Sequence, residues 1–153
     1  MRRTLVLVWI LTLGVFAADK SNFSGAWKLN SEQSDFGPMP GKPDKFERKV
    51  EQTGDAMKVT TTQSFNGQER TTEVSYQIDG EEHVVKYGNG EAKVTAVWKG
   101  KDLEVTAKRE AQGMSLTSVE KWVLAEDGKT LNVASLISLP QGEVNLKLVF
   151  QKQ

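Results

Sequence analysis

The stretch EAKVTAVWKGKDLEVTAKREAQG, residues 91–113, decides the fold class of this protein. Apolar side chains occupy every second position up to residue 98, and the alternation resumes at residue 103 after a glycine-containing turn. The apolar set is Ala92, Val94, Ala96, Trp98, Leu103, Val105 and Ala107. Because successive residues of a strand point to opposite faces of a sheet, the stretch predicts two half-buried β-strands joined by a tight hairpin.

The same pattern extends over most of the chain. Dipeptides such as Asn66-Gly67 and Asp79-Gly80 tolerate the positive φ that tight hairpins need. Turns of this kind separate ten candidate strands, at about residues 23–30, 45–52, 56–65, 68–78, 82–88, 91–99, 102–111, 115–125, 129–139 and 143–152. Closure of such a meander removes its exposed edges. We therefore predict an all-β fold, a single antiparallel up-and-down meander that closes into a barrel of about ten strands, with eight as the lower limit.

The first residues predict export. Met1-Arg2-Arg3 is a short cationic start, residues 5–15 are almost wholly apolar, and Ala17 suits the last position before a cleavage site. This order is typical of a secretory signal peptide. The alternative is a retained membrane anchor, but the apolar run is short against the ~20 residues that a bilayer span needs. We expect a signal peptide at residues 1–17, one barrel domain at residues 18–153, and a periplasmic or secreted protein.

The composition excludes several function classes. Loss of Arg2 and Arg3 with the leader leaves 18 basic against 20 acidic residues, a net charge of −2, which disfavours nucleic acid as a partner. The chain has no cysteine and a single histidine, His83, so thiol catalysis and the commonest zinc sites are excluded. No cofactor, metal or catalytic residue is expected, nor a membrane span after removal of the leader, and we expect a monomer or weak dimer.

One connection differs from the hairpins. The segment 31–44 holds Gly37-Pro38-Met39-Pro40-Gly41-Lys42-Pro43, with all but one of the four prolines of the chain. Proline excludes a regular helix or a central strand here, so we expect a semi-rigid flap. Long loops in small domains often cover functional sites; the alternative is a loop that only seals one end of the barrel.

Seven residues that the alternation places on inward faces are candidate ligand-binding residues: Arg48, Arg70, Tyr76, Trp98, Arg109, Glu120 and Trp122. A buried charge needs a partner, and two explanations stay open. Arg109 and Glu120 lie in consecutive strands and could pair with each other. Alternatively, an arginine faces a cavity and binds an anionic group of a ligand. The tryptophans and Tyr76 are explained either as core packing or as ligand contacts.

The opening strand, Phe23-Ser24-Gly25-Ala26-Trp27-Lys28-Leu29, resembles the start of the calycin superfamily, which includes lipocalins and fatty-acid-binding proteins. The segments 120–131 and 142–150 are similar to exported bacterial lipocalin-like domains. The resemblance implies that Gly25 and Trp27 close one barrel end, and the strand count favours the fatty-acid-binding branch. Two features of that branch are replaced: its helical lid by the flap, and its C-terminal Arg-x-Tyr by residues 147–150. No arginine is evident to stack on Trp27.

These observations favour a carrier of a small hydrophobic or amphipathic ligand, anionic ligands included, held inside the barrel. The alternative is an envelope interaction or inhibitor module with a filled barrel that acts through its loops, since a stiff exposed loop binds at a low entropic cost. No nucleophile elbow, phosphate loop or metal cluster points to an enzyme, which leaves catalysis as a third hypothesis.

Overall fold

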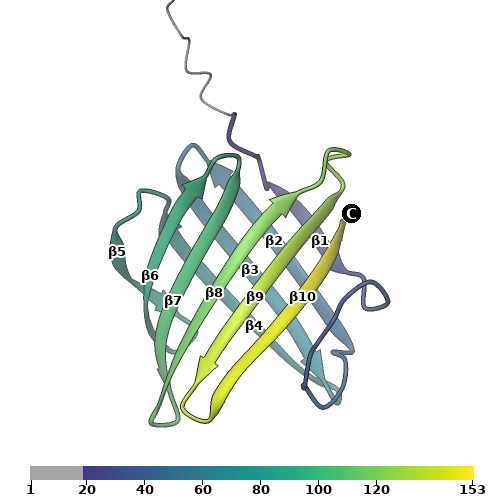
Figure 1. The fold of residues 1–153 in the computed structure, drawn as a ribbon, viewed down its shortest axis with the longest axis vertical. Coiled ribbons are helices and arrows are strands. Elements are labelled where there is room, and N and C mark those ends of the chain that lie inside the picture. Colours follow the sequence, from purple (N-terminus) through teal and green to yellow (C-terminus); the bar gives the residue numbers. More distant parts are fainter. Residues whose placement is uncertain (1–18) are drawn as a thin grey trace, which may run out of the picture.

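The structure, a computed structural model, describes residues 19–153 (Figure 1). The expected signal peptide lies outside the described residues. Within residues 19–153 there is no helix, so none that is long and apolar enough to cross a membrane. The strands are β1 (Gly25–Leu29), β2 (Lys45–Thr53), β3 (Ala56–Phe65), β4 (Gln68–Gln77), β5 (Glu82–Tyr87), β6 (Gly90–Lys99), β7 (Asp102–Ala111), β8 (Met114–Leu124), β9 (Thr130–Leu139) and β10 (Gly142–Lys152). The all-β meander of ten strands is confirmed, with strand ends within two residues of those predicted.

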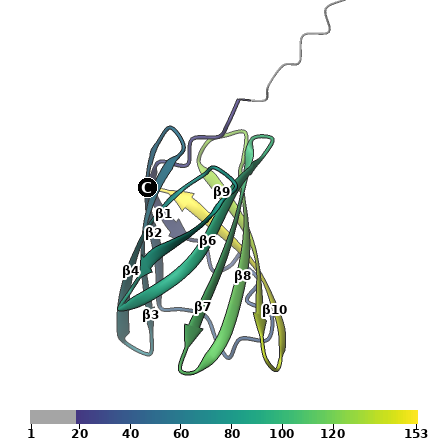
Figure 2. The ribbon, with the colours of Figure 1, turned by 90° about the vertical axis from the view of Figure 1, so that its left-hand side faces the viewer.

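All the strands belong to one antiparallel sheet in the order β4-β3-β2-β1-β10-β9-β8-β7-β6-β5. The first and last strands pair, with Trp27 opposite Lys152 and Leu29 opposite Phe150, and this pairing curls the sheet into a barrel (Figures 1 and 2). Among the described residues no backbone ladder joins β4 to β5, although the two strands lie in contact. The barrel is therefore nearly closed, with one break in its wall.

Two hairpins show why the turn dipeptides set the register. Phe65 pairs with Gln68 across Asn66 and Gly67, whose φ values are 51° and 75°. Ala111 pairs with Met114 in the same way. Positive φ at both central positions defines the type I′ turn, whose twist matches that of the flanking strands. Register fixed in this way decides which side chains face the interior.

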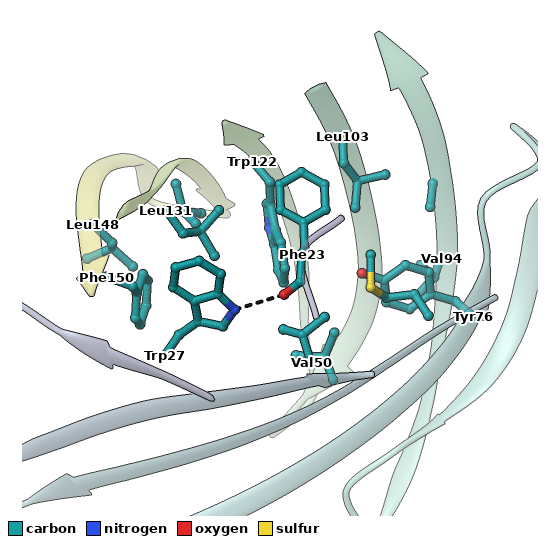
Figure 3. Close-up of a cluster of buried hydrophobic side chains, with 14 of the residues drawn as sticks. Phe23, Trp27, Val50, Tyr76, Val94, Leu103, Trp122, Leu131, Leu148 and Phe150 are labelled. Carbon is teal, nitrogen blue, oxygen red and sulfur yellow. Dashed lines mark hydrogen bonds between the residues drawn. The ribbon is translucent and has the colours of Figure 1, made fainter. Parts of the chain in front are cut away.

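We call the end of the barrel that holds Phe23 and the turns at Gly54 and Gly100 the closed end. It is filled by aromatic side chains (Figure 3). The Phe23 ring stands edge-on to Trp122 at 5.6 Å between ring centroids and stacks on Trp98 at 6.1 Å. Phe23 is fully buried and Trp122 is nearly so. Such aromatic pairs add to the free energy gained by burial of their surface.

Trp27 has the role at this end that the resemblance implied. It is buried, and its indole Nε1 donates a hydrogen bond of 2.8 Å to the carbonyl oxygen of Phe23 (Figure 3). The cation over its ring is a lysine: the Lys152 Nζ lies 5.5 Å from the ring centroid. Trp27 thus ties the segment before β1 to the last strand of the barrel.

The flap, residues 31–44, runs from β1 to β2 near the opposite end of the barrel, which we call the open end. Asp35 and Lys147 exchange two backbone hydrogen bonds of 2.7 and 2.8 Å, which pin the flap to β10. A Cβ on Gly37, whose φ is +54°, would lie 2.6 Å from the carbonyl oxygen of Asn145, so only glycine fits this close approach. At its far end Asp44 accepts a hydrogen bond of 3.1 Å from the backbone N–H of Gly67.

We predict that Val133→Ala destabilises the protein far more than Val84→Ala. Val133 is 1% exposed and Val84 is 62% exposed, and both lie within strands. The first change removes two buried methyl groups and leaves a cavity, an expected cost of about 2 kcal/mol, whereas an exposed change costs about 0.5 kcal/mol or less. Urea unfolding of both variants measures the difference; equal costs would contradict the assignment of inward faces.

Candidate functional site

The inward side chains fill the barrel at the closed end and leave it hollow toward the open end. Along β8, Trp122 belongs to the packed core, and Glu120, Ser118 and Leu116 follow at every second position toward the flap. Each of these four also lines a cavity of about 380 Å³ inside the barrel. Small ligands typically occupy pockets of roughly this size.

Six of the seven sequence-predicted site residues line this one cavity: Arg48, Arg70, Tyr76, Arg109, Glu120 and Trp122. Trp98 does not. Its ring packs on Phe23 at the closed end, and its indole Nε1 donates a hydrogen bond of 3.0 Å to Asp55. The structure therefore places Trp98 in the closure of the barrel, away from the cavity.

A bidentate ion pair forms the floor of the cavity. Arg48 of β2 donates from Nη1 to the Glu120 Oε2 at 3.0 Å and from Nη2 to the Glu120 Oε1 at 2.8 Å. The Trp122 indole Nε1 also donates to the Glu120 Oε2, at 2.8 Å. The pairing of Arg109 with Glu120 that the sequence suggested is therefore wrong, because the partner of Glu120 is Arg48 of a distant strand.

The Arg48 guanidinium is also enclosed by aromatic rings. Its Cζ lies 5.1 Å from the ring centroid of Trp122, 5.2 Å from that of Phe150 and 5.4 Å from that of Phe46. The side chain is 8% exposed, and within the described residues its Nε has no hydrogen-bond partner. Weakly hydrated guanidinium groups tolerate such surroundings better than ammonium groups do.

The electrostatics of the floor keep Glu120 ionised and Tyr76 protonated. Burial on its own raises the pKa of the Glu120 carboxyl, but the charge and N–H groups of Arg48 and the N–H of Trp122 lower that pKa below its usual value. Burial, and secondly the charge of Glu120, raise the pKa of the Tyr76 hydroxyl. Among the described residues no group hydrogen-bonds to that hydroxyl, so it can serve as a neutral donor toward the cavity.

Two further arginines lie toward the open end of the cavity. Arg70 stands near the start of β4, is exposed, and faces Gln63 across the ladder. Arg109 stands near the end of β7, is half-buried, and holds its Cζ 4.7 Å from the ring centroid of Tyr87. Within residues 19–153 no carboxylate lies within 4.0 Å of either guanidinium, although many lysines and Arg48 have such partners.

Sequence reasoning missed the part of the site that the flap supplies. Phe36, Met39 and Pro43 of the flap line the cavity at its open end. Phe36 is almost fully buried, whereas Met39 is 36% exposed. The apolar residues of the flap stand among prolines in the sequence and could have indicated a contact with the barrel interior. They were missed because alternation assigns inward faces only within strands. Ser135 of β9, a buried hydroxyl on the same lining, was hidden inside an otherwise apolar alternation.

The other titratable groups give no second centre in the described part of the chain. His83 hydrogen-bonds to Asp79 at 2.8 Å on the surface. No group of three or more histidine, aspartate or glutamate side chains within residues 19–153 is arranged to hold a metal ion. The cavity is therefore the candidate site.

Comparison with solved structures agrees with this architecture. Human cRBP IV superimposes with a TM-score of 0.54 and 21% sequence identity, over 87% of this chain and 99% of that one. Zebrafish ileal bile acid-binding protein, complexed with cholic acid, superimposes with a TM-score of 0.55 and 20% identity, over 86% of this chain and 98% of that one. No protein-family model and no curated protein sequence matches the chain.

At this level of identity the likeness shows the fold. The protein has the ten-stranded β-barrel fold of these two structures, with an internal cavity. Its ten antiparallel strands in one nearly closed meander match the fold of the fatty-acid-binding proteins and lipocalins, and the proline-rich flap stands where the resemblance to the fatty-acid-binding branch implied a helical lid.

We predict strong energetic coupling between Arg48 and Glu120. The Glu120→Leu variant leaves a buried guanidinium without its carboxylate, an expected cost of about 3–5 kcal/mol in unfolding free energy. The double variant Arg48→Met/Glu120→Leu removes both charges and is expected to be more stable than Glu120→Leu alone. Urea unfolding of the two single variants and the double variant gives the coupling energy.

The exposed pair Lys58–Glu73 is the matched control, with its Nζ and carboxylate oxygen 3.2 Å apart and side chains 43% and 56% exposed. The same cycle with Lys58→Met and Glu73→Leu is expected to give a coupling of about 1 kcal/mol or less. A coupling at Arg48–Glu120 no larger than this surface value would show that the floor pair is not effectively buried.

Proposed function

We propose that this protein is an exported carrier that holds a small hydrophobic or amphipathic ligand inside its barrel. The observation that carries the proposal is the cavity of about 380 Å³, enclosed by strands from both sides of the barrel and by the flap. Its walls combine apolar side chains with a few hydrogen-bonding groups, which is the usual composition of small-molecule sites.

The cavity also favours the carrier over the interaction module with a filled barrel. Small barrels are often filled by their own side chains. Here only the closed end is filled in this way, and small residues such as Ala107 and Ser118 leave room toward the flap. The flap contributes Phe36 and Met39 to the cavity wall, which fits a cover for a bound molecule better than a free-standing binding loop.

The structural neighbours add support. One of them is named as a bile acid-binding protein and was solved complexed with cholic acid. Barrels of this form therefore can hold a small organic molecule, and the same use of the interior is proposed for this chain.

Export rests on the order of residues 1–17, which is typical of a secretory signal peptide. The absence of cysteine is compatible with export, since packing and strand pairing then stabilise the fold in any redox compartment. We predict that the full chain, expressed in a Gram-negative host, is recovered from the periplasm with Ala18 as its first residue. N-terminal sequencing of the fractionated protein checks this. Recovery of a chain that keeps Met1 and the apolar segment would contradict the signal peptide.

We predict that Ala107→Trp abolishes ligand uptake. Ala107 points into the cavity from the middle of β7, so an indole at this position occupies the space proposed for the ligand. With N-phenyl-1-naphthylamine, a neutral fluorescent probe of apolar cavities, we expect binding by the mature wild-type protein and at least ten-fold weaker binding by the variant. Circular dichroism checks that the variant is folded.

Thr106→Trp is the matched control, since residue 106 lies next to Ala107 on the opposite face of the same strand. It is expected to bind the probe as the wild type does. The milder Val105→Phe, which also narrows the cavity, replaces Ala107→Trp if that variant does not fold. Equal probe binding by the inward and outward variants would contradict a ligand site inside the barrel.

A further inference from the structure

We propose that Met39 of the flap is an oxidant-sensitive site, and that conversion of its thioether to the sulfoxide weakens ligand binding in the barrel. This inference rests on the proposed carrier function and adds a means by which that function is regulated. Three features of Met39 carry it: its exposure, its place in the cavity wall and the proline-rich backbone that holds it there.

The three methionines within residues 19–153 differ in their access to solvent. Met39 is 36% exposed and Met114 is 43% exposed, whereas Met57 is 2% exposed and belongs to the packed core. The chain has no cysteine, so no thiol of the protein competes for an oxidant, and methionine is a common target of oxidation in proteins. A small oxidant in solution therefore reaches Met39 and Met114 but not Met57.

Of these three methionines, Met39 alone lines the cavity, together with Phe36 and Pro43 of the flap. Met114 follows the turn between β7 and β8 and is not part of the lining, to which β8 contributes from Leu116 onward. Oxidation of Met114 therefore changes an exposed hairpin, whereas oxidation of Met39 changes the wall that a bound molecule would touch.

The backbone around Met39 restricts how far its side chain can move away from the cavity. Met39 stands between Pro38 and Pro40. Proline fixes its own φ and also restricts the residue before it to extended conformations. The N–H of Met39 donates a hydrogen bond of 3.2 Å to the carbonyl oxygen of Phe36, and the carbonyl oxygen of Met39 accepts one of 2.8 Å from the N–H of Gly41. A chemical change in this side chain is therefore not relieved by a local rotation of the flap backbone.

The chemical step needs an oxidant of the peroxide class. The Met39 sulfur gives an electron pair to one oxygen of hydrogen peroxide; an S–O bond forms, the O–O bond breaks, and the second oxygen leaves as water with both protons. The thioether is oxidised, the peroxide is reduced, and a polar sulfoxide replaces an apolar group. A ligand that covers this sulfoxide removes its water without replacing the hydrogen bond, which opposes binding.

The first measurement is the pattern of oxidation, by mass spectrometry of peptides from the mature protein after timed treatment with hydrogen peroxide. We expect Met39 and Met114 to gain one oxygen atom each at rates at least ten-fold above that of the buried Met57. Saturation with N-phenyl-1-naphthylamine is expected to slow oxidation of Met39 at least two-fold relative to Met114 in the same sample. A rate at Met39 that is as low as that at Met57, or that is unaffected by the probe, overturns the inference.

The second measurement is the affinity for the same probe before and after treatment, with circular dichroism to check that the treated protein is folded. In the wild type and in the control Met114→Leu we expect oxidation to weaken binding at least five-fold. In Met39→Leu the same treatment is expected to change the affinity of that variant by less than two-fold. A mixture of the two methionine sulfoxide reductases, one for each sulfoxide epimer, is expected to restore binding with dithiothreitol, whose two thiols are oxidised to a disulfide as the sulfoxide oxygen leaves as water.

The two functions fail in distinguishable ways. Unchanged probe binding after complete oxidation of Met39, or an equal loss of binding in Met39→Leu, overturns the regulation by oxidation while the carrier function stands. If the untreated wild type does not bind the probe, the carrier function itself is overturned, and the regulation with it.

Discussion

A polar layer across the middle of the barrel organises the whole interior. Arg48 from β2 and Glu120 from β8 meet across the lumen although 72 residues separate them in the sequence. On one side of this pair the inward side chains pack into a solid core, and on the other they line a cavity. Neither charge can be moved along its strand without loss of the other, because a slip of one residue turns every side chain to the opposite face.

The closed end explains how the cavity can exist in a protein of this size. A hollow barrel gives up the burial that would otherwise stabilise it, so the remaining core has to be well packed. Phe23, Trp27 and Trp122 supply large apolar surfaces in a small volume, and the Trp27–Phe23 hydrogen bond fixes them to the segment before β1 (Figure 3). The pairing of β1 with β10 then brings the first and last strands to this core.

Much of the fold was predictable, because the faces of a strand and the hairpins that join strands follow from the local sequence. Alternation and turn dipeptides such as Asn66-Gly67 are local signals, and they gave the strands, the meander and the inward faces. The tie between Arg48 and Glu120 was not predictable in the same way. Each was recognised as a charge on an apolar face, but the choice of partner depends on how the sheet curls, and the neighbouring strand suggested Arg109. Trp98 shows a second limit, since alternation gives the face of a residue but not its depth in the barrel.

The ion pair between Arg48 and Glu120 matters more for where it places charge in the barrel than for the stability of the protein. Replacement of a buried ion pair by well-packed apolar residues often leaves a protein equally stable or makes it more stable. In addition, the Arg48 Nε has no hydrogen-bond partner in the described part of the chain. What the pair does achieve is electrostatic. It places a guanidinium deep in the barrel and cancels its charge there, so that the uncancelled positive charge of the lining lies at the open end with Arg70 and Arg109.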